Sequence, residues 1–122
     1  MKNIIAVILT YALLISMPVS ANTGKDIFDR YCTVCHSPSM AKMFNAPAAH
    51  DLHAWNERKE IALSKNIEIN LTDENRDEEA IKKLVVSATN GTDNGMPPMG
   101  TCMDCTDNDL KAAITFMSSI EN

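Results

Sequence analysis

Aromatic and basic residues are both scarce in this 122-residue chain. Phe, Trp and Tyr together make up 5% of it, so few bulky side chains can fill a core, which points to another component there. Lys and Arg number 11 against 16 Asp and Glu, a net charge of −5. This balance argues against a nucleic-acid-binding protein and favours a basic partner. The length suits one small domain.

The chain has one long apolar run, at its N-terminus. Lys2 precedes an apolar stretch from Ile4 to Met17, and small residues follow at 19–21, as in a secretory signal with its cleavage site. An uncleaved membrane anchor is the alternative, but the run is shorter than the roughly 20 residues that cross a bilayer. We predict a signal peptide at residues 1–21, one domain over residues 22–122, a periplasmic location and no stable membrane insertion after cleavage.

The remaining sequence has mainly helical periodicity, which predicts an all-α domain. The expected helices run from Asn22-Thr23 into Cys32, from Asp51 to about Leu63, from the acidic residues at 77–79 to just before Gly91, and onward from a Thr106 cap. Ile67, Ile69 and Leu71 alternate with polar residues, but without a partner strand they are interpreted as an extended loop. The Gly- and Pro-rich loop 90–105 is the segment where function is expected.

The strongest chemical motif is Cys32-Thr33-Val34-Cys35-His36. Its spacing places two sulfurs about one helical turn apart, where both can form thioethers with one haem, and His36 then faces the iron. A thioredoxin-type CxxC and a zinc knuckle are alternatives. The first lacks a βαβ pattern, and the second needs thiolates that stay reduced outside the cytoplasm. The motif therefore predicts one covalent haem c on Cys32 and Cys35.

A sulfur ligand for the opposite side of the iron is expected from Met96-Pro97-Pro98-Met99. The two prolines fix the backbone around a thioether, so Met96 is the first candidate and Met99 the second. A methionine that only fills the core is the simpler alternative. His50 and His53 are further candidates, and either would lower the reduction potential relative to a thioether.

The chain from Gly24 to Ile120 resembles the class I c-type cytochromes, and most of all the cytochrome c5 family. The residues that carry the resemblance are Gly24, Phe28 and Tyr31 before the CxxCH motif, Asn45-Ala46-Pro47, Trp55-x-x-Arg58, Met96-Pro97-Pro98 with Gly100-Thr101-Cys102, and Cys102-x-x-Cys105 ahead of Asp109-Leu110-Lys111-Ala112-Ala113. The resemblance implies a helical fold wrapped around one haem, with the first and last helices crossing. This chain departs from the family in a longer, more acidic segment 66–77 and in Met99, where a polar residue is usual.

The resemblance also implies roles for individual residues. His36 and Met96 would be the axial ligands, and the Pro47 carbonyl would accept a hydrogen bond from the His36 ring. Trp55 and Arg58 would lie near the haem propionates, although a core aromatic and a solvated charge are the simpler interpretations.

The second cysteine pair, Cys102 and Cys105, is expected to form a disulfide, in agreement with the resemblance. Thr106 stands where a second haem motif would need His, a zinc site is excluded if the first pair holds haem, and a catalytic dithiol is the remaining alternative. The ring is so short that its main effect would be on the shape of the methionine loop.

These residues together predict an electron-transfer protein, not an enzyme. It would be a soluble, monomeric, monohaem carrier that exchanges single electrons with a partner bearing a basic docking face, such as a terminal oxidase or reductase. The alternatives are a haem-based gas sensor, in which the methionine is displaced from the iron, and a small haem subunit of a larger oxidoreductase.

Overall fold

The computed structural model describes residues 23–65 and 70–121, and within these ranges it contains helices and no strand. The elements in chain order are α1 (Gly24–Ile27), the π-helical segment η2 (Phe28–Cys32), α2 (Thr33–His36), α3 (Leu52–Ser64), α4 (Arg76–Asn90), the 3₁₀ turn η3 (Pro98–Thr101) and α5 (Asp107–Met117). The prediction of an all-α fold is confirmed. The alternating residues Ile67 and Ile69 lie outside the described residues.

The first helix extends further than the sequence indicated. We expected it to end at Cys32, but α1, η2 and α2 form one continuous helical rod that ends at His36. The reason is a widened turn: the Thr33 N–H donates to the Phe28 carbonyl, five residues back, so the rod continues past Cys32. Such π-helical turns are common at functional sites.

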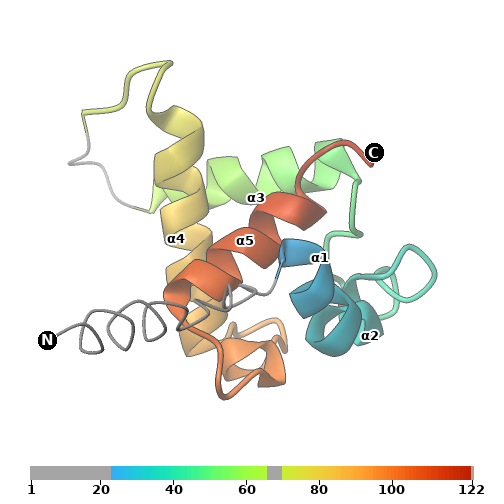
Figure 1. Ribbon diagram of the computed structural model, residues 1–122. Coiled ribbons are helices and arrows are strands. Elements are labelled where there is room, and N and C mark those ends of the chain that lie inside the picture. The colour runs from blue at the N-terminus through green and yellow to red at the C-terminus, as the bar shows by residue number, and fades with distance from the viewer. Residues whose placement is uncertain (1–22, 66–69, 122) are drawn as a thin grey trace, which may run out of the picture.

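The crossing of the first and last helices depends on a residue without a side chain. A Cβ atom on Gly24 would lie 2.6 Å from the carbonyl carbon of Ala112, closer still to its oxygen, and 3.0 Å from the Phe116 Cβ. The α1 backbone therefore rests directly on α5, and Figure 1 shows the two helices against each other. The ring of Phe28 extends this contact, with its centroid 5.5 Å from that of Phe116.

The core is formed by the first helical rod, the loop before α3, and the facing sides of α3, α4 and α5. Its buried members are Phe28, Ala49, Trp55, Ile81, Val85, Ala88, Leu110, Ile114 and Met117. Among the described residues, no large side chain is less than 2% exposed. Phe28 and Trp55 are the two aromatic residues among these buried core members. None of the helices in residues 23–65 and 70–121 is long and apolar enough to cross a membrane.

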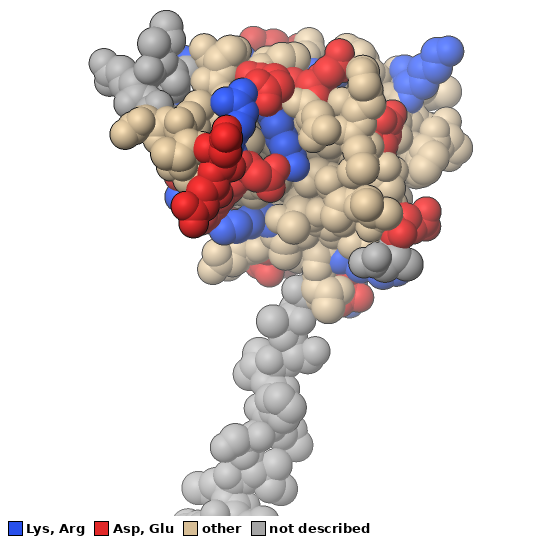
Figure 2. Space-filling view, turned by 90° about the horizontal axis from the view of Figure 1, so that it is seen from above, with Lys and Arg blue, Asp and Glu red and all other residues tan. Residues whose placement is uncertain are grey.

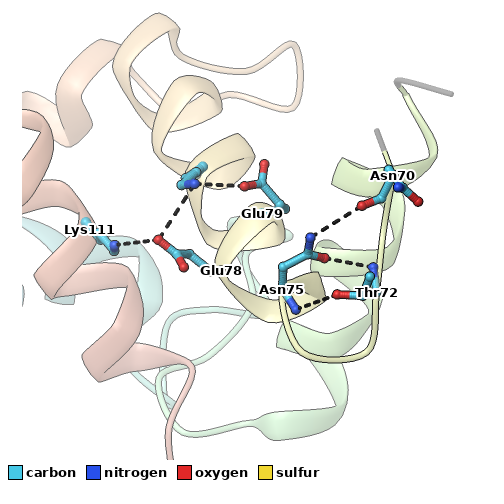
Figure 3. Close-up of polar contacts among 7 residues, drawn as sticks. Asn70, Thr72, Asn75, Glu78, Glu79 and Lys111 are labelled. Atoms are coloured by element: carbon cyan, nitrogen blue, oxygen red, sulfur yellow. Dashed lines mark hydrogen bonds and ion pairs between the residues drawn. The ribbon is translucent and has the colours of Figure 1, made fainter. Parts of the chain in front are cut away.

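Polar contacts fix the approach to α4 and its contact with α5 (Figure 3). Asn75 and Thr72 exchange two hydrogen bonds, of 2.9 and 3.3 Å, and the Asn75 amide also donates to the Asn70 carbonyl. On α4, Glu78 lies 3.8 Å from the ammonium group of Lys111 on α5. The first turn of α4 carries acidic side chains, and their negative charges interact favourably with the positive N-terminal end of the helix dipole.

The start of α5 carries the capping box that its sequence predicts. Asp109 accepts 2.8 Å hydrogen bonds from the Thr106 N–H and hydroxyl, and these lower the pKa of the Asp109 carboxyl. A lowered pKa in the folded state means that this carboxylate stabilises the protein above its unfolded pKa of about 4, and that the contribution disappears as the pH falls through the folded value.

The variant Asp109→Asn is therefore expected to be less stable than the wild type at pH 7 and to approach it in stability near pH 3. Urea denaturation at the two pH values measures this. An equal stability difference at both pH values would contradict the role of the charge.

Candidate haem site

The CxxCH motif lies at the end of the first helical rod. Cys32 ends η2 and Cys35 lies in α2, and both are free, half-buried thiols. Cys32 packs against the core cluster, and burial, with a smaller effect of Cys35, raises the pKa of its thiol to about 11. Cys32 therefore stands at the core surface, and Cys35 lies about one helical turn further along the chain.

His36 is buried, with 8% of its surface exposed. Its Nδ1 lies 2.8 Å from the Pro47 carbonyl oxygen, and because a carbonyl only accepts, Nδ1 carries the proton. Burial lowers the pKa of His36; the Pro47 hydrogen bond acts in the opposite direction, and the charge of Arg58 lowers the pKa further. The neutral ring thus has a lone pair on Nε2, the arrangement in which histidine binds a metal.

The loop between α4 and α5 presents two half-buried methionines, Met96 and Met99, which both pack against the core cluster. Thr92 closes the loop around Met96: its N–H donates to the Met96 carbonyl at 3.0 Å, and its hydroxyl accepts from the Met96 N–H at 3.2 Å. A Cβ on Gly91 would lie 2.9 Å from the same carbonyl, so the loop needs glycine there. The choice of Met96 over Met99 as ligand stays a prediction.

A disulfide joins Cys102 and Cys105 between the methionine loop and α5, with the two Cα atoms 5.4 Å apart. The Cys102 N–H donates to the Met99 carbonyl at 3.1 Å, and Cys105 precedes the cap residue Thr106. The ring therefore connects the methionine loop to the start of the last helix.

Trp55 and Arg58 project from α3 toward the loop before it. Trp55 is 4% exposed, its ring stacks on that of His36 at an interplanar angle of 23° and a centroid distance of 5.8 Å, and its Nε1 donates to the Ala48 carbonyl at 2.9 Å. Arg58 donates from Nη2 to the Asn45 carbonyl at 3.0 Å. Their expected position near the haem propionates stays a prediction.

The two other histidine candidates lie before and within the first turn of α3. His50 has a left-handed backbone (φ 66°), its Nδ1 donates to the Ser119 carbonyl at 2.8 Å, and its ring makes a T-shaped contact with that of Phe116. It therefore connects this loop to the end of the chain, a role that no spacing in the sequence indicated. His53 is exposed on α3.

These residues fit a covalently bound haem. The two free thiols have the required spacing, and the Pro47 hydrogen bond leaves Nε2 of His36 as the ring nitrogen with a lone pair. When bound, the haem iron takes up and releases one electron. Around it, His36 would supply nitrogen and the methionine loop sulfur.

Comparisons with known proteins agree with this site. The protein family described as "Cytochrome C oxidase, cbb3-type, subunit III" matches residues 19–117. A cytochrome c5 of Azotobacter vinelandii is 35% identical over 100 residues, which cover 82% of this chain and 96% of that protein. A cytochrome c5 of Ectopseudomonas mendocina is 31% identical over 100 residues, which cover 82% of this chain and 92% of that protein.

Proposed function

Because the chain belongs to the cytochrome c family, as a monohaem electron carrier with haem c on Cys32 and Cys35, we propose that it works in the periplasm with His36 and Met96 as axial ligands. The single observation that carries the ligand proposal is the Nδ1–Pro47 hydrogen bond, which leaves Nε2 of His36 for the iron. Met96 supports it from a half-buried position on the core. With both positions filled, a substrate has no open site on the iron.

Carbon monoxide tests this proposal against a gas sensor. A reduced carrier whose iron has two strong protein ligands is expected to show almost no spectral change with the gas. Rapid, stoichiometric binding would instead favour the sensor.

The periplasmic location follows from the proposed signal peptide at residues 1–21 and a mature domain that begins at Asn22. The Cys102–Cys105 disulfide supports export, because such bonds persist outside the cytoplasm. Mass spectrometry of the protein purified from the periplasm should give a chain that begins at Asn22 and carries one haem. A chain that retains residues 1–21 would indicate a membrane anchor instead.

The partner is proposed to have a basic docking face. On α3 and α4 most acidic side chains are paired with bases, as in the Arg76–Glu60 and Lys59–Asp77 ion pairs, and Figure 2 shows acidic and basic side chains in contact on one face. Between Lys83 and Lys111, in contrast, the chain has no Lys or Arg and contains exposed Asp93, Asp104 and Asp107. These exposed carboxylates give the segment around the methionine loop a local negative charge, which would attract a basic surface.

Small inorganic complexes measure this charge without the natural partner. Electron transfer to a cationic ruthenium ammine complex is expected to slow as ionic strength rises, and transfer to ferricyanide to speed up. The double variant Asp104→Asn/Asp107→Asn should flatten both trends more than Glu60→Gln/Asp77→Asn, whose wild-type carboxylates are paired with bases. Electron-transfer rates that do not change with ionic strength would contradict electrostatic steering.

A second candidate is a small haem subunit of a larger oxidoreductase, and the description of the matching family as an oxidase subunit favours it. Size-exclusion chromatography of the native extract separates the two. Recovery as a free monomer supports the carrier, and co-elution with an oxidase supports the subunit.

A further inference from the structure

We propose that Trp55 and Arg58 are positioning residues for His36, because they hold the loop that places the Pro47 carbonyl on the imidazole Nδ1–H. This inference rests on the proposed ligation of iron by His36. It assigns the two α3 side chains a role within the protein that is independent of any contact with the haem propionates.

The loop between α2 and α3 is held at both ends by its own backbone. The Ala46 N–H donates to the Ala41 carbonyl at 2.9 Å, and the Ala49 N–H donates to the His36 carbonyl at 2.7 Å. The His50 N–H donates to the Met117 carbonyl of α5 at 2.6 Å. Pro47 has no N–H, so the residue whose carbonyl faces His36 donates no backbone hydrogen bond of its own.

Helix α3 adds side-chain restraints on both sides of Pro47, beside the backbone hydrogen bond from the Asp51 N–H to the Ala48 carbonyl at 3.1 Å. Arg58 binds the Asn45 carbonyl, two residues before it, and Trp55 binds the Ala48 carbonyl, one residue after it. The two side chains are three residues apart, so they lie on the same face of the helix. Asp51 fixes the start of that helix by accepting from the Ala54 N–H at 3.1 Å.

Trp55 restrains His36 in a second way, because its ring stacks on the imidazole at an interplanar angle of 23°. One residue therefore acts on both sides of the His36–Pro47 hydrogen bond: its ring packs on the donor His36, and its Nε1–H binds the Ala48 carbonyl, one residue after the acceptor Pro47. The single N–H of Trp55 is already used by Ala48, which supports a role toward the loop.

The expected consequence concerns the strength of the iron ligand. A hydrogen bond from Nδ1–H to a well-placed carbonyl makes the imidazole more basic, and a more basic ligand favours ferric iron. If the loop loosens, the hydrogen bond weakens, the Nδ1 proton exchanges faster with solvent, and the reduction potential rises.

The test uses the haem-loaded protein and two loop variants. Trp55→Phe keeps an aromatic ring without the N–H and changes no charge, and Arg58→Gln removes the guanidinium group. The control, Lys59→Gln, removes one positive charge from the next residue of α3, where the ammonium group binds Asp77 at 2.7 Å instead of the loop. NMR measures exchange of the His36 Nδ1 proton in the reduced protein, and voltammetry measures the potential.

Exchange is expected to be at least tenfold faster in Trp55→Phe and in Arg58→Gln, with wild-type rates in Lys59→Gln, and the potential of Trp55→Phe should rise. Wild-type exchange and potential in Trp55→Phe, or wild-type exchange in Arg58→Gln, would overturn the proposal. If Trp55→Phe does not fold, the comparison of Arg58→Gln with Lys59→Gln decides, because these two adjacent positions are both half-buried and lose the same charge. Failure of His36 ligation itself would appear separately, as missing hyperfine shifts of the His36 ring in the ferric wild type.

Discussion

Alanine in place of Gly24 is expected to destabilise the oxidised, haem-loaded protein by about 3 kcal/mol, the upper end of the usual cost of overpacking. The added Cβ would overlap the backbone of Ala112, and a backbone atom cannot rotate away as a side chain can. Either α1 or α5 must move. Because α1 continues through η2 to Cys32 and His36, that movement also reaches the haem-binding residues.

Helix propensity distinguishes a steric clash at Gly24 from the usual effect of replacing glycine by alanine in a helix. Alanine is a better helix former than glycine by about 1 kcal/mol, so an uncrowded helical position would be stabilised by the same change. Guanidinium denaturation with an unchanged slope gives the difference in stability. A neutral or stabilising effect of Gly24→Ala would show that the helices do not touch at this position.

Gly95→Ala is the matched control. A Cβ at Gly95 would meet no heavy atom within 4 Å, and the only cost there is the backbone angle φ of 101°, worth about 1–2 kcal/mol. The loss at Gly24 should exceed the loss at Gly95. Equal losses would indicate that glycine content alone, and not the helix crossing, determines stability.

The second large effect is expected for Met96→Leu. Leucine fills a similar volume but offers no sulfur, so the iron would keep His36 and lose its opposite ligand. The reduction potential should fall by a few hundred millivolts, within the span of about 0.8 V that axial ligands control, and the reduced protein should now bind carbon monoxide. Voltammetry and a carbon monoxide titration measure the two changes.

Met99→Leu controls for the loss of a methionine from the same loop. Met99 also packs against the core, but its backbone is left-handed (φ 61°) and its carbonyl accepts from Cys102, whereas Met96 is bracketed by Thr92. We expect Met99→Leu to keep a reduction potential near that of the wild type, and we expect its reduced form not to bind carbon monoxide. If the two variants exchange these properties, Met99 is the ligand.

Much of the fold could be predicted because its signals are local. The Thr106–Asp109 capping box and the apolar spacing of α5 lie within a few residues of each other, and Gly91 marks the end of α4. Gly24 was recognised only as part of a family resemblance. Its physical role depends on Ala112, far along the chain, and no local pattern shows that contact.

The haem-attachment motif was equally clear, because its two cysteines and His36 lie within five consecutive residues and their spacing is the one that haem attachment requires. The π-helical turn before it was not, since a helix widened by one residue has no periodicity of its own. The hydrogen bonds of Trp55 and Arg58 to the loop carbonyls could not be predicted from the sequence either, because every residue has a backbone carbonyl and none is marked as the acceptor. Asn45 gave a partial signal: asparagine tolerates the left-handed backbone that it adopts at φ 51°.

The near-infrared absorption spectrum of the ferric wild-type protein tests the central claim most directly. Sulfur coordination to ferric haem produces a weak band in this region, so a carrier with His36 and methionine ligands should show it and should lose it in Met96→Leu but not in Met99→Leu. A covalently attached haem without that band in the wild type would contradict the account, because its iron would then be held by a second histidine or left open.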